Sequence, residues 1–531
     1  MCRSQLERNP KFGAAWQAVV LPRIDLGGLA GTLTRLVLAL WGVSICHADA
    51  AAQTPSARAL TVSPSFSVTQ TFSDNFLASS AEPASDWITR LTAGVTVVAR
   101  SGTVRGALDY SLSLLLHARH SDRNVFQNNL NTAFSMDLVP GRTRVDVSAN
   151  VSQSAISAFG VQPGRDSAVR DNATELRTLR IAPSTRGPLG PDFRYSAGLN
   201  LVASDAKDTA VGDSISSSAD LHIEPTGKRV VTWSADASML RSDFKAGRAT
   251  ADDRLFGSTH VQLDSLDTQL RASGGVEYSD MASASVQRYS NWGLGATWTP
   301  SVRATLDAQY DHRFFGASRR IKFEYRTPLT SWRISKSSSL TNSGGQNESG
   351  SPGTAYELLY SQFSSILPDP LKRADFVNAY LRGLGIDPAS QPGFLRASVA
   401  LVDREEISMA WRGIRTTAIF TWSNTKSSSL RLQPGVADDL SQTSEVRQTG
   451  LSLDLAHRLT PDSSAGILLS SLSGHGGTAS QSSRQRQLAV RYSLRPSANS
   501  DLSVGARRGL FDTSPAAYDE SAVFVTLGYR F

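Results

Sequence analysis

Apolar and polar residues alternate in segment after segment of this chain. Between Val104 and Leu116, the even-numbered residues are apolar or glycine, whereas the odd-numbered residues include Arg105 and Asp109. Successive side chains of a β-strand point to opposite faces, so this pattern predicts a strand with one apolar and one polar face. The same pattern recurs at 144–151, 194–201, 231–239, 302–310 and 488–495.

The alternation continues along the chain without a domain boundary, unlike the pattern of a soluble β-sandwich. A sandwich buries its apolar faces in a shared core and ends after about 100 to 250 residues, whereas this chain has 531. Charged residues lie in mid-strand on the polar faces, as a transmembrane barrel requires, because lipid covers the apolar face and water the lumen. Closing the sheet into a barrel also gives every backbone N–H and C=O group of the strands a hydrogen-bond partner. We therefore predict an all-β fold, a large antiparallel transmembrane β-barrel over residues 65–531.

Connections of two lengths alternate between the predicted strands. Short ones, rich in turn-forming residues, lie at 99–103, 139–143, 224–229, 298–302, 459–463 and 495–499. Longer polar ones lie at 73–86, 117–129, 157–173, 204–214, 242–254, 426–442 and 473–483. Short periplasmic turns and long outer loops are typical of bacterial outer-membrane barrels. Counting strands on this basis predicts about 22, within an even-numbered range of about 16 to 22, provided that Asp403–Glu405 is a tight turn.

The last predicted strand ends the chain on an aromatic residue. Its apolar face carries an alternating series that resembles the signal by which outer-membrane barrels are recognised for assembly: Val523, Val525, Leu527, Tyr529 and Phe531. The expected partners are therefore outer-membrane lipid and, through this strand, the barrel-assembly machinery. The alternative is a soluble edge strand that ends in phenylalanine.

The alternation stops between residues 335 and 393. A Ser/Gly/Asn-rich linker is expected up to Thr354, followed by one helix over 355–367 and a second over 371–384. Counting strands places this helical insertion on the periplasmic side. It is either a plug, gate or docking element for a periplasmic partner, or a small helical hairpin packed on the barrel rim.

The first 48 residues have the layout of a secretory signal peptide. A net-positive stretch precedes the apolar run 36–46, and small residues follow, so cleavage is expected near Ala48 or Ala50, with an N-terminal linker over 49–64. The run is well short of the roughly 20 residues that span a bilayer, which disfavours a membrane anchor. It could instead form a buried core helix, or Cys46 could carry a lipid. Cleavage removes both cysteines, Cys2 and Cys46, as suits an oxidising compartment.

Charge adds little to the picture of possible partners. The formal net charge is +7; residues 1–48 hold five basic and two acidic residues, so the remainder carries 7 − 3 = +4. No Lys/Arg-rich cluster with interleaved aromatics occurs, so no nucleic-acid surface is expected. The mixed-sign charges on the polar faces predict a hydrated, weakly selective lumen. Its candidate lining residues are Arg105, Asp109, Arg144, Asp146, Arg194, Asp236, Arg303, Asp307 and Arg491.

The sequence offers no convincing catalytic constellation. His117 and His120, with Asp122 nearby, have a spacing that suits a metal, but a continued strand would send the two histidines to opposite faces, so a rim or loop position is expected. No Gly-x-Ser-x-Gly motif stands in the strand–turn–helix setting that a nucleophile elbow needs. We therefore expect no catalytic residues, no cofactor and no metal.

Two stretches, Val151–Gln162 and Glu175–Pro183, resemble an uncharacterised family associated with the PEP-CTERM/exosortase system. The segments Thr71–Asn75 and 394–399 are also similar to this family, and the resemblance extends loosely over residues 60–531. It implies a Gram-negative outer-membrane barrel found alongside exopolysaccharide biosynthesis and export, with a role in moving or anchoring surface polysaccharide. The family offers no catalytic residues to compare.

Three hypotheses follow from these observations. The leading one is a passage or export component for extracellular polysaccharide, with the polysaccharide or periplasmic export proteins as partners. The second is a non-conducting structural or docking barrel that anchors surface or periplasmic machinery. The third, an outer-membrane hydrolase, requires a histidine such as His117, His120, His312 or His475 within hydrogen-bond reach of both a carboxylate and a hydroxyl.

Overall fold

The computed structural model describes residues 60–531 except 81, 163–171, 228–229, 264–266, 342–353, 364–366, 368–372, 374–375, 378–392, 432–437, 479–480 and 514–515. The expected signal peptide (1–48) and residues 49–59 of the expected linker lie outside the described residues. The first strand begins at Leu60, so residues 60–64, expected in the linker, belong to the barrel.

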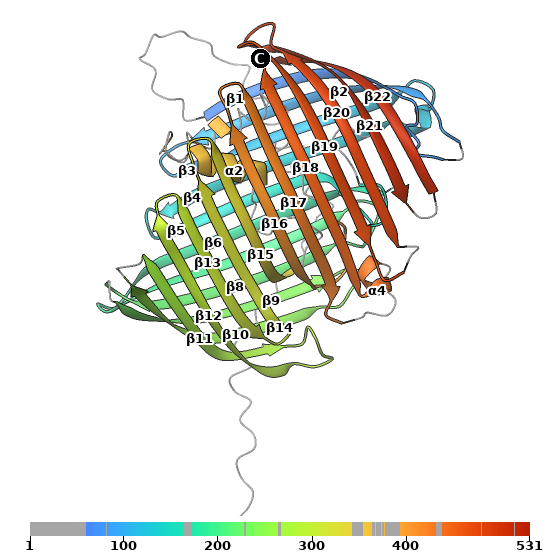
Figure 1. The fold of residues 1–531 in the computed structure, drawn as a ribbon. Coiled ribbons are helices and arrows are strands. Elements are labelled where there is room, and N and C mark those ends of the chain that lie inside the picture. Colours follow the sequence, from blue (N-terminus) through green and yellow to red (C-terminus); the bar gives the residue numbers. More distant parts are fainter. Residues whose placement is uncertain are drawn as a thin grey trace, which may run out of the picture. The chain divides into compact units, whose positions relative to one another are not determined.

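Strands make up nearly all of the described chain (Figure 1). In order they are β1 (Leu60–Ser73), β2 (Asp86–Arg100), β3 (Val104–His117), β4 (Val125–Val139), β5 (Thr143–Ala155), β6 (Ala173–Leu189), β7 (Phe193–Ala206), β8 (Ser214–Pro225), β9 (Val231–Phe244), β10 (Thr250–Leu263), β11 (Thr268–Ser279), β12 (Gln287–Ser301), β13 (Ala304–Arg313), β14 (Gly316–Arg326), β15 (Thr330–Thr341), β16 (Ala400–Arg412), β17 (Thr416–Ser429), β18 (Glu445–Arg458), β19 (Ser463–His475), β20 (Ser482–Leu494), β21 (Ser500–Thr513) and β22 (Ala516–Arg530).

The helices are short: α2 (Thr354–Gln362), α4 (Asp439–Thr443) and the 3-10 turn η1 (Ser121–Arg123). Among the described residues, no helix is long and apolar enough to cross a membrane.

Each strand pairs antiparallel with the next one in the chain, and β22 pairs with β1. Ser65 and Arg530 begin the closing register, which continues to Ser73 and Ala522. The sheet is therefore a closed, 22-stranded antiparallel barrel, which confirms the predicted fold class. Closure satisfies the backbone groups of both terminal strands, which would otherwise be exposed edges.

The register divides each strand between an inner and an outer face. On β22, Val523 and Leu527 lie on the outer face and are 52% and 59% exposed, whereas Glu520 and Phe524 lie on the inner face and are buried. Large apolar residues recur on the outer faces around the barrel, among them Phe66, Trp233, Leu294 and Leu488. Such an outer surface is stable in lipid and not in water, so the chain is a β-barrel protein of the bacterial outer membrane.

The two ends of the barrel differ in the length of their connections. One end, called the short-turn end, carries turns such as 101–103, 140–142 and 495–499 together with the start of β1 and the end of β22. The other, the long-loop end, carries loops such as 74–85 and 156–172. All six predicted short turns and all seven predicted long loops fall at the expected ends.

The sequence-based position of the helical insertion is wrong. Asp403–Glu405 is not a tight turn: these residues lie within β16, where Asp403 and Glu405 face outward near the rim and contact Ser338 and Lys336 of β15. β15 also runs on through 335–341, which the sequence assigned to a linker. Thr341 and Ala400 are register partners, so the insertion spans 342–399 and joins the wall at the long-loop end, not at the short-turn end.

Candidate functional site

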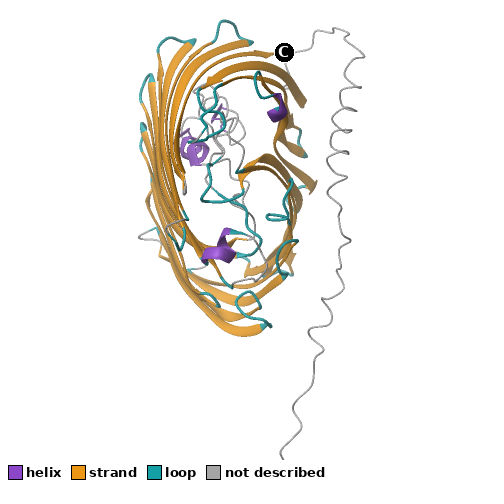
Figure 2. Cartoon of the chain, turned by 90° about the vertical axis from the view of Figure 1, so that its right-hand side faces the viewer, coloured by secondary structure: helices purple, strands orange, loops and turns teal. Residues whose placement is uncertain are grey.

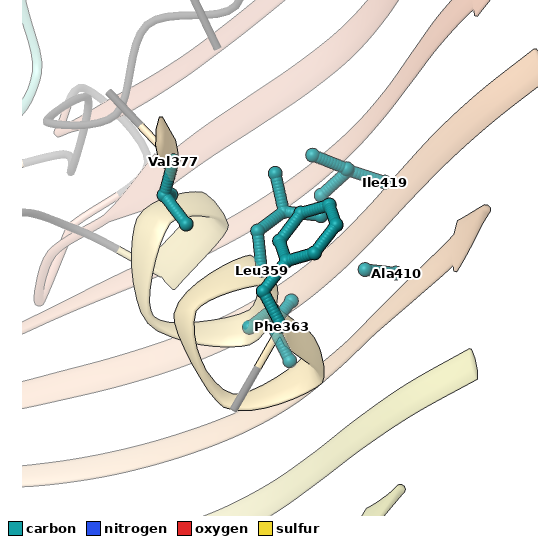
Figure 3. Packing of buried hydrophobic residues seen from close by; sticks show 6 residues of the cluster. Leu359, Phe363, Val377, Ala410 and Ile419 are labelled. Carbon is teal, nitrogen blue, oxygen red and sulfur yellow. The ribbon is translucent and has the colours of Figure 1, made fainter. Parts of the chain in front are cut away.

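Helix α2 of the insertion lies inside the barrel. Figure 2 shows helices and loops within the ring of strands. Leu358 and Leu359 of α2, and Phe363 directly after it, contact the inner face of the wall and are fully buried. They pack on Ala410 of β16 and Ile419 of β17 (Figure 3). Ala410 and Ile419 are register partners, and the neighbouring Ile407 of β16 points to the opposite, outer face.

Although the insertion joins the wall at the long-loop end, α2 lies near the short-turn end. Arg326, the last residue of β14, donates a hydrogen bond from Nη1 to the Ser361 carbonyl oxygen at 3.4 Å. The guanidinium of Arg412, the last residue of β16, lies 4.6 Å from the centre of the Phe363 ring. Both arginines belong to the short-turn rim. The insertion therefore reaches along the lumen, which favours a plug over a hairpin on the rim.

The first predicted helix is present, and the second lies for the most part outside the described residues. The helix expected over 355–367 corresponds to α2. Of the expected helix 371–384, Val377 is described: it is fully buried and packs in the same cluster as Leu359 and Phe363.

Residues 393–399, called here the crossing segment, join opposite walls of the barrel at the long-loop end. Phe394 forms a parallel bridge with Ala155 of β5, and the Leu395 N–H donates to the Ala155 carbonyl at 3.0 Å. The segment continues directly into Ala400 of β16, which lies eleven strands away from β5 on the 22-stranded barrel. Six residues span at most about 21 Å, so the two walls approach each other closely here.

Apolar side chains of the crossing segment pack on several loops of this end. Leu395 packs on Leu176, Ala206 and Val211. Phe394 packs on Ala158 and Leu440, and Val399 on Phe244 and Met281. Burying a side chain of this size contributes roughly 1.5–3 kcal/mol, so the segment holds the loops of β5–β6, β7–β8, β9–β10, β11–β12 and β17–β18 around a common centre.

Two adjacent carboxylates tie the β17–β18 loop to this centre. Asp438 accepts a hydrogen bond from the Ala397 N–H at 2.9 Å and caps the N-terminus of α4. Asp439 accepts from the Ala158 N–H at 2.6 Å and from the Ser157 hydroxyl at 3.0 Å. Burial raises the pKa of the Asp439 carboxyl above its ordinary value, and the charge of Asp438 adds to the shift; the hydrogen bonds to Ala158 and Ser157 oppose it.

Glycines permit the close approach of loops to the crossing segment. A Cβ atom at Gly247 would lie 2.0 Å from the Ala397 carbonyl oxygen. Gly212 has a φ of +97°, a left-handed conformation that side chains rarely adopt, and it lies against the Leu395 side chain. The sequence pattern placed both glycines in loops but did not indicate their role, because the contacts join residues far apart in the chain.

Eight of the nine predicted lumen residues lie in strands with their side chains on the inner face: Arg105, Asp109, Arg144, Asp146, Arg194, Asp236, Asp307 and Arg491. The ninth, Arg303, lies in the turn between β12 and β13 at the short-turn end. The alternation through Ala304 suggested a strand there, but β12 runs to Ser301 and the chain turns at residues 302–303.

The inner-face charges form local pairs around the wall and one denser network on β10–β13, in which Arg313 contacts Asp252 and Glu277 and Arg254 lies 3.9 Å from Asp311. Arg194 Nε lies 2.7 Å from Glu224 Oε1, and Arg271 Nη2 lies 2.6 Å from Asp307 Oδ2. Arg144 pairs with Asp137 at 3.0 Å. The partners Glu224, Arg271 and Asp137 were not predicted, because cross-strand register decides them. Pairing leaves the inner wall with little net charge at these positions.

The inner face of β1 carries only hydroxyl side chains, a feature that sequence reasoning missed. They are Thr61, Ser63, Ser65, Ser67, Thr69, Thr71 and Ser73. Most are partly exposed, and the row continues across neighbouring strands, where Thr69 and Thr526 hydroxyls lie 2.9 Å apart and Thr92 and Ser113 hydroxyls 2.8 Å apart. The period-2 run of Ser and Thr was visible in the sequence and could have revealed this hydroxyl wall.

Three of the histidines, His117, His120 and His222, each lie beside a carboxylate. His117, the last residue of β3, and His120, in the following loop, each place Nδ1 near Asp86 Oδ2, at 3.3 and 3.2 Å. In the lumen, Asp236 lies between His222 Nδ1 (2.6 Å) and the Ser234 hydroxyl (2.9 Å). In a Ser–His–Asp triad the hydroxyl contacts the imidazole directly, whereas here the Asp236 carboxylate lies between Ser234 and His222. In the part of the chain that the structure describes, no group of three or more His, Cys, Asp or Glu could hold a metal.

The residues of the expected assembly signal lie on the outer face of the closing strand. Val523, Val525, Leu527 and Tyr529 alternate with inner-face residues of β22, and Phe531 follows, its N–H donating to the Pro64 carbonyl at 3.0 Å. Their recognition by the assembly machinery stays a prediction.

No protein-family model matches the sequence, and no curated protein is similar to it. Among solved structures, the chain is similar to the siderophore receptor PirA from Pseudomonas aeruginosa, with 11% identity and a TM-score of 0.40 over 90% of this chain and 81% of that chain. It is also similar to the FrpB iron transporter from Neisseria meningitidis (F3-3 variant), with 10% identity and a TM-score of 0.44 over 88% and 81%. At this identity the similarity concerns the barrel fold alone.

Proposed function

We propose that the protein is a gated passage of the outer membrane, through which extracellular polysaccharide crosses. The observation that carries the proposal is the position of α2 and the crossing segment inside the barrel, where they obstruct the lumen at both ends. A wall of 22 paired strands is rigid, whereas the crossing segment is held by side-chain packing and single hydrogen bonds. Displacing these contacts opens the passage without breaking the barrel.

The chemistry of the inner wall supports a neutral, hydroxyl-rich cargo. The hydroxyl wall on β1 offers donors and acceptors to sugar hydroxyl groups without any formal charge. Each hydrogen bond between a sugar and the wall replaces a hydrogen bond to water, so it contributes only about 1 kcal/mol to the binding free energy. Weak and repeated contacts suit a polymer that must slide through, because conduction needs binding that is easily released. The paired lumen charges leave no strong field that would select one ion sign.

The resemblance to the PEP-CTERM/exosortase-associated family supplies the biological context of this proposal. Its members are associated with exopolysaccharide synthesis and export, which agrees with a passage for a neutral polymer. Short periplasmic turns and long outer loops orient the crossing segment toward the cell exterior and α2 toward the periplasm.

Permeation through a variant without the insertion tests the proposal. Because Thr341 and Ala400 are register partners, an Asn-Gly turn can replace residues 342–399 and close a β-hairpin. In proteoliposomes we expect this variant to pass neutral oligosaccharides faster than anionic oligosaccharides of equal size. S65V/S67V, on the hydroxyl wall, should slow the neutral sugars, whereas the outward-facing pair S471V/S473V should not. A folded deletion variant that excludes neutral sugars, together with unchanged surface polysaccharide in cells lacking the protein, contradicts the proposal.

A non-conducting docking barrel is the second candidate. The observation that favours it is Phe376, which contacts Phe363 in the α2 cluster and is itself 42% exposed, as a partner-binding aromatic would be. If the deletion variant stays impermeable and the full-length protein captures periplasmic proteins in a way that depends on Phe376, the docking function replaces the passage.

A further inference from the structure

Basic residues gather on the outer face of the barrel near the long-loop end, on neighbouring strands at the orange-to-red end of Figure 1. This basic patch consists of Lys426 on β17, Arg447 on β18, Arg484 and Arg486 on β20, and Arg508 on β21. The register places Lys426 opposite Arg447, and all five side chains point away from the lumen. The long loops begin within a few residues of each of them.

On β20 the basic patch borders the apolar band that lipid covers, and Arg508 on β21 is the register partner of Leu488 at the upper edge of that band. On β20 the outer face reads Arg484 and Arg486 toward the long-loop end, then Leu488, Val490 and Tyr492 toward the short-turn end, and these three are well exposed. Leu451 and Leu469 continue the apolar band on β18 and β19. An apolar band in such barrels is about 25 Å tall, so Arg484 and Arg486 lie where lipid headgroups begin.

Two of the five cations have no protein partner among the residues that the structure describes. Lys426 pairs with Glu445 at 2.8 Å, and Arg508 pairs with Asp519 at 2.9 Å. Arg447 lies 3.8 Å from Glu445, which it shares with Lys426. Arg484 and Arg486 are exposed and make no hydrogen bond or ion pair with described residues, although Asp512 is the register partner of Arg484. Two free guanidinium groups thus project from one strand on the same face.

The wall formed by β2, β3 and β4 has no such patch. At the same end of the barrel, the outer faces of β2, β3 and β4 carry Trp87, Leu116 and Phe126. Trp87 is 47% exposed and Phe126 60% exposed. The basic patch is therefore absent from β2–β4, although single outward-facing cations also lie at this end on other strands: Arg241 on β9, Arg288 on β12, Arg319 on β14 and Lys336 on β15.

We propose that the basic patch binds the phosphate groups of the lipopolysaccharide in the outer leaflet. An arginine presents a planar fork of donors that matches phosphate oxygens and forms strong charge-assisted hydrogen bonds. The acyl chains of the same molecule would pack on Leu488 and Val490 just below. A soluble anion would gain nothing from that apolar band, so a phosphorylated glycolipid fits both halves of the surface. This inference depends on the orientation of the barrel and not on whether the lumen conducts.

Lipid binding by the full-length protein in detergent tests the inference. We would measure retention of diphosphoryl lipid A by native mass spectrometry and compare it with lipid A stripped of its phosphates. R484A/R486A should bind diphosphoryl lipid A at least about tenfold more weakly than the unchanged protein, because two charge-assisted contacts are lost. The matched control R303A/R415A removes two exposed arginines from turns at the short-turn end and should bind like the unchanged protein.

Other results decide against the inference. Equal retention of diphosphoryl lipid A by R484A/R486A and the unchanged protein overturns it, provided that both migrate as folded, heat-modifiable species. Equal retention of dephosphorylated lipid A, or equally tight binding of phosphatidylglycerol, also overturns it, because the surface then recognises acyl chains or negative charge in general. Weakening of the specific binding by salt is expected.

Discussion

Single residues at the long-loop end hold the crossing segment against the loops, and Gly247 shows how close the contact is. Ala397 lies between Gly247 on one side and the Asp438 carboxylate on the other. Gly247 and Asp438 both contact the backbone of Ala397, although they lie about 150 and 40 residues from it in the chain. Such contacts depend on the tertiary fold, so no local sequence pattern predicts them.

Gly247→Ala is expected to displace the crossing segment, because the added Cβ would lie 2.0 Å from the Ala397 carbonyl oxygen. We would measure thiol labelling of a cysteine placed at Ser398, since the two natural cysteines lie at positions 2 and 46. Labelling should accelerate by about tenfold, which corresponds to about 1.4 kcal/mol. The matched control is Gly102→Ala, where no atom lies within 4 Å of the added Cβ. Equal labelling in both variants would show that the contact does not restrain the segment.

Phe363→Ala is expected to release α2 from the barrel wall. The ring is fully buried against the inner face and stacks beneath Arg412, and truncating a buried phenylalanine costs about 3–5 kcal/mol. Hydrogen exchange of the α2 amides should accelerate at least a hundredfold, while the strands stay protected. Phe126→Ala, on the lipid-facing side and 60% exposed, makes the same chemical change without touching α2. Unchanged α2 protection in Phe363→Ala would contradict the position assigned to the helix.

At the scale of elements, α4 and its two carboxylates link the β17–β18 loop to the 156–162 loop and to the crossing segment. The buried Asp439 carboxyl has a raised pKa in this closed arrangement and returns to its ordinary value when the loop moves into water. The closed arrangement therefore binds the proton more strongly. Protonation of Asp439 therefore stabilises the closed arrangement. This stabilisation is fully present below the ordinary pKa of the carboxyl and is lost as the pH rises through the raised pKa of the closed arrangement.

The pH dependence can be read from a spin label at Val161→Cys. We expect the mobile fraction of the label to be smaller at pH 4 than at pH 7, and the difference to vanish in Asp439→Asn, which cannot titrate. A label that becomes more mobile as pH falls would have the opposite sign and would refute the burial argument.

Local patterns predicted the elements well but not where the insertion lies. Helix α2 was found from the spacing of Leu358, Leu359 and Phe363, because helical periodicity is local. Its contact with Ala410 and Ile419 could not be found, since these small and apolar residues look like ordinary strand positions. The turn at Asp403–Glu405 was a condition of the strand count, because the alternation of short turns and long loops required a turn there. Cross-strand partners such as Lys336 accommodate these charged residues within β16.

At the scale of the whole molecule, the barrel was predictable because period-2 alternation repeats around its wall. Closure of the sheet was predictable because an open sheet would expose unpaired backbone groups to lipid. Eight of the nine predicted lumen residues face the lumen. The face of a residue could be predicted because alternate residues along a strand point to opposite sides of the sheet. The pairing of the lumen residues with Glu224, Arg271 and His222 was not predictable, because register between neighbouring strands decides it. The resulting lumen has a hydroxyl wall on one side and paired charges on others, and a segment that belongs to its own wall crosses it at the long-loop end.

The most direct test of this account is the single-channel conductance of two proteins in planar bilayers: the full-length chain and the variant in which Asn-Gly replaces residues 342–399. The account predicts that the full-length protein is closed most of the time with brief openings, and that the folded deletion variant shows a large and steady conductance. A deletion variant that inserts as a heat-modifiable barrel but conducts no better than the full-length protein would contradict the claim that the insertion closes the lumen.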